Sequence, residues 1–359
     1  MPVDGQGTTR GGGNNARGSA PYGAATLRDV AVRAGVHPAT ASRALNPGTR
    51  SLVSEETAAR VLSVAEEIGY RPNPMARGLK TNRSQTIGVL IPDLTNPLFP
   101  PIVRGIEDTI ALEGYTAVLA NSDNQREKER LLFENMSARQ VEGFILATAE
   151  LDHPLIEDAI AADVPIVLLN RTVESAKAFA VVGNDRAGAA IATNHLIDLG
   201  HRQIAHIVGP SKFSTAVARY QGFLDTMRTH EIEVDPELVR FGTAFVEDEG
   251  LRLFNELVEN GNRFTAIFCA NDLLAMGCYD GLRERGIRCP EDVSIIGYND
   301  IPFLDKLNPP LTSIRIPQYE IGAEAGRLLL ERIGDPTARA RTTMLEPELI
   351  VRGSTAPPS

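Results

Sequence analysis

Short apolar runs alternate with amphipathic stretches over most of this chain, and this alternation constrains the fold more than any other feature. Runs such as 86–92 and 164–170 have the length of a buried strand, and the segments between the runs carry apolar residues at helical spacing. The pattern is typical of a mostly parallel sheet covered by helices on both faces. Nine such runs favour two α/β lobes over a single sheet. The expected strands are 86–92, 115–120, 141–148, 164–170, 179–183, 203–209, 264–270, 293–298 and 312–316. The helices expected between them include 99–112, 125–138, 186–199, 216–230 and 248–259.

Polar pairs follow several of the expected strands. They are Pro92-Asp93, Asn184-Asp185, Asn271-Asp272 and Asn299-Asp300. Open α/β sheets bind their ligands at the carboxyl ends of the strands. We therefore expect polar side chains at these positions to line a ligand site.

Residues 26–70 predict three short helices with a tight turn between the first two. Thr26 begins a sequence that resembles a capping box, Gly35 ends the first helix, and Pro38 suits the first turn of the second. Ser54, followed by two glutamates, opens the third helix. The pattern is that of a helix-turn-helix, and a three-helix core with a solvated polar face is the alternative.

The second of these helices carries side chains that could read a major groove. Arg43 can make two hydrogen bonds to guanine, and Thr40 and Ser42 can bind bases or phosphates. Pro38-Ala39 offers a methyl contact to thymine but little hydrogen bonding. We therefore expect Arg43 to carry much of any sequence preference.

Charge is unevenly distributed along the chain. The formal net charge of -10, taken alone, argues against nucleic acid as a partner. Residues 1–83 contain eleven Lys/Arg and six Asp/Glu, a balance of +5, whereas the rest contains 25 and 40, a balance of −15. A basic module joined to an acidic body favours DNA binding by the module, because repulsion from phosphate would keep the body away.

Other features exclude further classes of protein. The apolar runs are far shorter than the ~20 residues of a membrane-spanning helix, and residues 1–20 lack the apolar segment of a secretory signal. Cys269, Cys278 and Cys289 are too irregularly spaced for a disulfide framework or a zinc site. The six histidines are scattered, and no glycine-rich phosphate loop opens a helix. We expect a cytoplasmic protein with free cysteines and with no metal, cofactor or catalytic site.

Further motifs follow one another in order along residues 26–353. After the helix-turn-helix of 27–46 come Val53-Ser54-Glu55-Glu56-Thr57, Tyr70-Arg71-Pro72-Asn73-Pro74-Met75-Ala76-Arg77-Gly78-Leu79, Ile87-Gly88-Val89, Asp93-Leu94-Thr95-Asn96-Pro97, Gly200-His201, Arg219 with Gly222-Phe223, Ala270-Asn271-Asp272, Ser294-Ile295-Ile296-Gly297-Tyr298-Asn299-Asp300 and Pro309-Pro310-Leu311-Thr312. Together these motifs resemble the lactose-repressor/purine-repressor (LacI/GalR) family of transcription regulators.

The resemblance implies a headpiece and a hinge helix that forms when a homodimer binds a palindromic operator. A leucine of each hinge would wedge into the minor groove, and Leu79 occupies that position. Ordinary linker packing is the alternative for Leu79. His37 stands where the family commonly has a small hydroxyl cap; it would cap less well or contact a phosphate, and a solvated side chain is the alternative. The residues expected to contact double-stranded operator DNA are Thr26, Leu27, His37, Pro38, Ala39, Thr40, Ser42, Arg43, Asn46, Ser54, Asn73, Ala76, Arg77 and Leu79.

For the body, the resemblance implies a two-lobed α/β core like that of type I periplasmic binding proteins, with an effector site between the lobes. Phe99 and Phe245 could stack on a sugar ring, and Arg219 could bind hydroxyls or a carboxylate. Core packing is the alternative for the two phenylalanines, and a turn that satisfies its own backbone is the alternative for Asn170-Arg171. Asn299 replaces an acidic residue found in many relatives, so the same sugar specificity is not implied. The expected effector-binding residues are Asn96, Leu98, Phe99, Asn170, Arg171, Arg219, Phe245, Asn271 and Asn299.

These observations predict an all-α helix-turn-helix headpiece followed by a two-lobed α/β core. The expected parts are a tail at 1–25, the headpiece at 26–71, a hinge at 72–84, one lobe from 85–184 and 316–342, the other from 185–315 and 343–353, and a disordered tail at 354–359. The predicted function is that of a dimeric repressor controlled by a small, sugar-like effector. A two-lobed solute-binding protein without a DNA role is the alternative, and an enzyme is disfavoured by the missing catalytic motifs.

Overall fold

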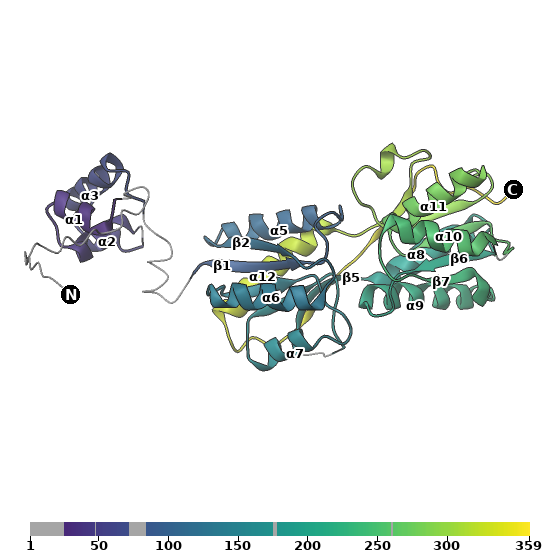
Figure 1. Cartoon of the computed structure of the whole chain (residues 1–359), viewed down its shortest axis with the longest axis horizontal. Helices are drawn as coiled ribbons and strands as arrows, with labels where there is room; N and C mark the ends of the chain where they lie inside the picture. The colour runs from purple at the N-terminus through teal and green to yellow at the C-terminus, as the bar shows by residue number, and fades with distance from the viewer. Residues whose placement is uncertain (1–24, 47, 72–83, 175–177, 260) are drawn as a thin grey trace, which may run out of the picture. The chain divides into compact units, whose positions relative to one another are not determined.

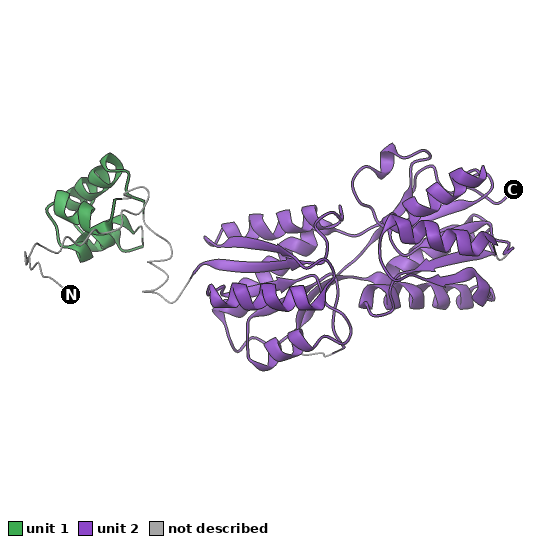
Figure 2. Ribbon diagram, viewed as in Figure 1, with its two compact units in different colours: residues 1–82 green, residues 83–359 purple. Residues whose placement is uncertain are grey.

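The computed structural model describes residues 25–46, 48–71, 84–174, 178–259 and 261–359. The chain divides into two compact units, 1–82 and 83–359 (Figure 2). No helix in the described ranges is long and apolar enough to cross a bilayer.

The first unit contains the three helices that the sequence predicts. They are α1 (Leu27–Arg33), α2 (Pro38–Leu45) and α3 (Glu55–Glu67), with a short 3-10 turn η1 (Arg50–Leu52) between the last two. Small apolar side chains such as Ala41 and Ala44 face a common core with Val30 and Val61. Gly35 has a φ of +64°, a backbone conformation that favours glycine, and thereby allows the tight turn between α1 and α2.

The first lobe of the second unit is built on a parallel sheet (Figure 1). In the described residues this sheet has six strands in the order β11-β5-β4-β3-β1-β2, and all neighbours are parallel. Helices cover both faces of its central strands, which explains why these strands are apolar throughout rather than alternating. The elements are β1 (Thr86–Ile91), α5 (Phe99–Ala111), β2 (Thr116–Asn121), α6 (Arg126–Ala138), β3 (Gly143–Leu146), α7 (Pro154–Ala161), β4 (Ile166–Leu169), β5 (Phe179–Gly183), α12 (Gln318–Gly334) and β11 (Thr342–Leu345).

The second lobe has a sheet of the same kind. Its order is β12-β10-β9-β8-β6-β7, and only β12 runs antiparallel to its neighbour among the described strands. The elements are α8 (Asp185–Asp198), β6 (Ile204–Val208), α9 (Ser214–Thr229), η2 (Pro236–Leu238), β7 (Val239–Phe241), α10 (Glu247–Glu259), β8 (Ala266–Cys269), α11 (Asp272–Arg285), β9 (Ser294–Asn299), η3 (Leu304–Lys306), β10 (Thr312–Arg315) and β12 (Glu348–Ile350). One buried apolar cluster runs through both lobes. The two α/β lobes, all nine expected strands and all five expected helices are confirmed, whereas β7, β11 and β12 were not foreseen.

The chain passes between the lobes three times, and the third passage lies later in the chain than the sequence predicts. The passages follow β5, β10 and β11 (Figure 1). The sequence-based boundary after 342 is wrong, because Thr342–Leu345 pairs with β5 in the first lobe. The last passage therefore lies between Leu345 and Glu348. Strand β11 is a short edge strand without a continuous apolar run, and this is why the sequence did not reveal it.

The end of the chain is also packed rather than disordered. Ser354 is fully buried, its carbonyl accepts a hydrogen bond from the Ile295 amide at 2.8 Å, and its hydroxyl accepts one from the Thr312 amide at 2.8 Å. The carbonyl of Ala356 lies 2.9 Å from the His201 ring. The predicted tail at 354–359 is therefore wrong at least as far as Ala356, because these hydrogen bonds join the chain end to β9, β10 and His201.

Helices α5 and α12 cross at a glycine contact. A Cβ at Gly105 would overlap the backbone of Tyr319, and a Cβ at Gly322 would overlap that of Ile102. Each glycine lets the backbone of the other helix approach where a side chain would block it. Helix α12 thus packs closely on α5 as well as on β3, β4 and β5 of the first sheet.

Candidate functional site

Helix α2 presents one exposed face in the first unit. Ala39 and Arg43 are exposed on it, and Thr40 and Ser42 are half-buried beside them. The side chains of Thr40, Ser42 and Arg43 make no hydrogen bond or ion pair with any described residue. These are the polar groups on α2 that remain available for a partner.

The other predicted contact residues of this unit have local roles in the fold. His37 caps α2, because its Nδ1 accepts a hydrogen bond from the Ala39 amide at 3.2 Å. Thr26 and Ser54 cap α1 and α3, and the Asn46 side chain accepts from the Gly48 amide at 3.1 Å. Capping does not exclude DNA contact, but it orients these side chains toward their own helix ends. Leu27 packs against the headpiece core. Asn73, Ala76, Arg77 and Leu79 lie outside the described residues.

Two further arginines of this unit are structural, which sequence reasoning missed. The Arg50 Nε donates to the Ala44 carbonyl at 3.1 Å, and the Arg60 Nε donates to the Ala34 carbonyl at 3.1 Å. Cations that bind the last carbonyls of a helix satisfy groups that lack partners and favour the helix dipole. Two of the arginines that make this module basic therefore also hold its helix ends.

A cleft between the two lobes gathers all nine predicted effector residues. Thr215, which is buried, completes the lining and was not predicted. The side chains come from the carboxyl ends of strands and from the starts of α5, α9 and α11. The cleft holds about 20 Å³ in this state, enough for roughly one water molecule. The lining is Asn96, Leu98, Phe99, Asn170, Arg171, Thr215, Arg219, Phe245, Asn271 and Asn299.

Arg219 is the organising cation of the cleft. Its Nε donates to the Asp185 carboxylate at 2.8 Å, its Nη1 to the Ala270 carbonyl, and its Nη2 to Asn299 Oδ1 at 3.3 Å. The guanidinium also stacks 3.7 Å from the ring centre of Tyr298. Burial raises the pKa of Asp185, although Arg219 acts in the opposite direction. Arg219 thus ties the starts of α8 and α9 to the ends of β8 and β9.

Two asparagines of the cleft have unusual backbones. Asn170 has a φ of +64° and Asn299 a φ of +110°. Non-glycine residues in this region cost free energy and gather at functional sites. Asn170 is 5% exposed and its side chain makes no hydrogen bond within the described ranges. Asn271 differs, since its Oδ1 caps α11 through the Leu274 amide at 2.9 Å.

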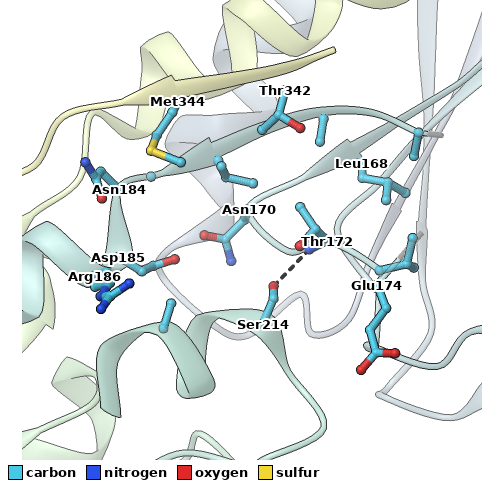
Figure 3. A pocket seen from close by; sticks show the side chains of 16 residues that line it. Leu168, Asn170, Thr172, Glu174, Asn184, Asp185, Arg186, Ser214, Thr342 and Met344 are labelled. Atoms are coloured by element: carbon cyan, nitrogen blue, oxygen red, sulfur yellow. Dashed lines mark hydrogen bonds between the residues drawn. The ribbon is translucent and has the colours of Figure 1, made fainter. Parts of the chain in front are cut away.

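The two lobes touch directly beside this cleft. Lys212 of the second lobe places its Nζ 2.6 Å from the Glu150 carboxylate of the first, and its carbonyl accepts from the Leu151 amide at 2.9 Å. The Thr172 amide donates to Ser214 Oγ at 2.9 Å across the same boundary (Figure 3). These contacts join the two lobes, and the cleft in this arrangement has little free volume.

A larger pocket of about 430 Å³ adjoins the cleft on the far side of Asn170. Figure 3 shows the amide of Asn170 pointing into this pocket, between Ser214 and strand β11. The apolar ends of β4, β5 and β11 form one wall, and the starts of α8 and α9 form the other. Asn170 therefore separates two hollows at the boundary of the lobes.

Asp272 follows the cleft residue Asn271, and its buried carboxyl group makes the stability of the core depend on pH. Its carboxylate is fully buried and accepts from Ser313 Oγ at 2.6 Å and from the Ile301 amide at 3.0 Å. Burial raises its pKa from 3.8 to about 7. Between these values the folded core holds a proton that the unfolded chain has lost, so the stabilisation present at low pH falls as the pH rises through about 7.

We expect Asp272→Asn to remove this component of the pH dependence. Between about pH 5 and pH 8, the melting temperature of the wild type should fall more than that of the variant. The difference corresponds to roughly a few kcal/mol in the free energy of unfolding. Thermal melts of both proteins at the two pH values provide the measurement. Parallel pH profiles would show that Asp272 keeps an ordinary pKa.

The described residues contain no group of three or more His, Cys, Asp or Glu side chains placed to hold a metal ion. Cys269 and Cys278 are buried and free, and Cys289 is free and half-buried. The polar groups that line the cleft are four asparagine amides, one threonine hydroxyl and two guanidinium groups.

Models of known protein families match both the first unit and the core of this chain. Residues 26–73 match the model of bacterial regulatory proteins of the lacI family, and residues 193–355 match that of a periplasmic binding protein-like domain. The chain is 35% identical over 333 residues to the HTH-type transcriptional repressor CytR of Escherichia coli K12, covering 92% of this chain and 96% of CytR. It is 34% identical over 331 residues to the repressor PurR of Vibrio atlanticus, covering 92% and 98%.

Solved structures show the same relationship. A complex of the transcriptional regulator CelR with cellobiose has a TM-score of 0.71 and 32% identity, covering 92% of this chain and 99% of that one. The lac repressor dimer bound to operator and the anti-inducer ONPF has a TM-score of 0.81 and 25% identity, covering 93% and 99%. This chain belongs to the LacI family of bacterial regulatory proteins and is a DNA-binding transcription regulator.

Proposed function

We propose that this protein is a repressor that binds a palindromic operator as a homodimer and responds to a small effector between the lobes of its core. The observation that carries the proposal is the convergence of polar side chains from both lobes on one cleft, in a chain whose α2 leaves Arg43 free. A ligand that both lobes hold changes the stability of the closed arrangement of the core relative to the open one. The relatives CytR and PurR are repressors, and the lac repressor structure is a dimer on operator.

We further propose that the effector is sugar-like, that the protein works in the cytoplasm, where its operator lies, and that it catalyses no reaction. CelR was solved with cellobiose and an Enterococcus faecium LacI-family regulator with ribose. Phe99 is buried at the edge of the cleft and Phe245 is half-buried, so both can offer apolar ring faces to such a ligand. Asn299 and Asn170 add hydrogen-bonding groups that suit hydroxyls.

The test combines a thermal-shift screen with operator binding. Full-length protein is screened against sugars and phosphosugars, and each hit is added to a fluorescence-anisotropy titration of palindromic DNA. We expect at least one hit to change operator affinity by a factor of 5–150, the range of common allosteric couplings. Tight ligand binding that leaves operator affinity unchanged would favour the solute-binding alternative.

A separate prediction concerns Leu79, which lies outside the described residues. If each protomer inserts this leucine into the minor groove, Leu79→Ala will bend operator DNA less than wild type, because an alanine cannot unstack the central base step. Circular-permutation gels measure the bend, and size-exclusion chromatography checks that the variant is still a dimer. An unchanged bend angle would mean that Leu79 only packs within the linker.

A further inference from the structure

Arg171 is a buried cation without a partner in the described part of the chain. The residue is only 6% exposed, and its Nε and Nη1 have no hydrogen-bond acceptor. The guanidinium lies 3.6 Å over the ring centre of Phe213 and 6.0 Å from that of Phe245. A ring face attracts a cation, but it neutralises no charge and satisfies no N–H group in the plane.

The carboxylates near Arg171 are occupied by other groups. Asp185 binds Arg219 at 2.8 Å. Glu150 binds Lys212 at 2.6 Å and also Arg126. A third carboxylate, Glu129, accepts from Thr148 and faces His153 at 3.3 Å. Among the described residues, the lining of the cleft therefore holds two guanidinium groups, of which Arg219 alone has a carboxylate partner.

The start of helix α9 adds to the positive potential. Phe213 precedes the helix, and no side chain caps its first turn. By contrast, Asn184 caps α8 and Asn271 caps α11. Free N–H groups at the start of a sixteen-residue helix attract anions. Thr215, in that first turn, lines the cleft together with Arg171.

Arg171 stays charged under physiological conditions. Burial, together with the neighbouring Arg219, lowers its pKa to about 10, although the charges of Glu150 and Glu129 act in the opposite direction. At that pKa the guanidinium is still protonated at neutral pH. A buried charge without a counter-ion is costly for the fold. The cost is recovered when a ligand supplies the missing negative charge.

We propose that the effector of this cleft carries an oxyanion, either a carboxylate or a phosphate, that pairs with Arg171 at the start of α9. This inference rests on the proposed effector role of the cleft and adds the chemical class of the ligand. A carboxylate or phosphate accepts two parallel hydrogen bonds from one guanidinium. A neutral sugar would satisfy donors of Arg171 but would leave its charge without a counter-ion.

Entry of the ligand requires the lobes to separate, because the closed cleft has room for about one water molecule. The contacts that must open are those of Lys212 with Glu150 and of Ser214 with Thr172. The oxyanion would then sit between Arg171 of the first lobe and α9 of the second. It would hold the two lobes together through charge.

The first experiment uses simple anions as probes. Full-length wild type, Arg171→Met and Arg283→Gln are melted in sodium chloride, inorganic phosphate or acetate at equal ionic strength and pH. We expect phosphate or acetate to raise the melting temperature of wild type above its value in chloride, and Arg171→Met to lose this shift. Arg283→Gln removes the same charge from an exposed residue late in α11, where Arg283 pairs with Asp280, and it should keep the shift. Equal responses of wild type and Arg171→Met, including no response in either, would overturn the proposal.

The second experiment uses matched sugars. Glucose, glucuronate and glucose 6-phosphate, and ribose with ribose 5-phosphate, are titrated into the same proteins by calorimetry. We expect the anionic member of a binding pair to bind wild type roughly 10- to 100-fold more tightly than its neutral counterpart, and Arg171→Met to lose this preference. Comparison of glucuronate with glucose 6-phosphate separates carboxylate from phosphate. Equally tight binding of a neutral sugar by wild type and Arg171→Met overturns the inference while the proposed function stands. Wild type that fails to bind operator overturns the proposed function and leaves the anion result unaffected.

Discussion

Arg219→Met will lose both the effector response and much of the stability of the core. The side chain is 3% exposed, and its removal leaves the buried carboxylate of Asp185 without its cation. Breaking one side of a buried ion pair costs about 3–5 kcal/mol. The hydrogen bonds to Ala270 and Asn299, which join two strand ends of the second lobe, disappear with it. Urea denaturation of full-length protein, followed at an absorption or dichroism signal of the core, measures the loss.

A double variant separates folding from recognition. Arg219→Met with Asp185→Asn removes both charges, so it should recover most of the lost stability, as replaced buried pairs often do. Its operator affinity without effector should be close to that of wild type, because the first unit is unchanged. The effector found by the thermal-shift screen should nevertheless leave that affinity unaltered. A double variant that responds like wild type would show that Arg219 only supports the fold.

Arg43→Ala will weaken operator binding by about 1–3 kcal/mol, roughly 5- to 150-fold, and relax the preference at one base pair. Arg43 is exposed on α2 and forms no ion pair with any described residue, so its removal should leave the stability of the headpiece nearly unchanged. Two hydrogen bonds to one guanine are the contact that discriminates best in a major groove. Titrations of a set of operators, each changed at a single base pair, measure both effects.

Arg33→Ala is the matched control for this prediction. It removes the same charge from α1, where Arg33 is exposed and lies 3.8 Å from Glu67. We expect a small, uniform loss of affinity across all operators, since a cation away from the bases contributes only through the general potential. If Arg43→Ala behaves in the same uniform way, Arg43 contacts phosphate rather than a base.

The sequence predicts the fold well where the physics is local or repetitive. The apolar runs of β1, β3 and β4 are buried on both faces, and burial of this kind leaves a continuous signal. Helix caps such as Thr26 and Asn271 use side chains adjacent to the helix they stabilise. The order of elements then follows from alternation alone.

Features that depend on distant pairing are harder to predict. Strand β11 is identified as part of the first lobe only by its register with β5, more than 150 residues earlier in the chain. No sequence pattern around Ser354 predicts its hydrogen bonds with Ile295 and Thr312. Edge strands and chain ends have little hydrophobic periodicity, so sequence patterns do not reveal that they are ordered.

In the candidate site too, the sequence predicts which residues take part but not how residues distant in the chain pair with one another. All nine effector residues predicted from family motifs lie on one cleft, but Thr215 lies outside those motifs and was missed. The motifs also gave no indication that Asp185 would be the counter-ion of Arg219 while Arg171 would have none. Which charges are paired depends on the packing of two lobes, and no spacing within one segment encodes it.

The three passages of the chain between the lobes constrain how relatives of this protein can be recombined. The first unit ends at a single junction near residue 82, so a gene fusion with one breakpoint could exchange the DNA-reading module. Exchange of one core lobe needs three breakpoints, after β5, β10 and β11, and each must preserve the packing on both sides. New operator preferences are therefore easy to acquire by shuffling. New ligand preferences must come mostly from point substitutions in the cleft.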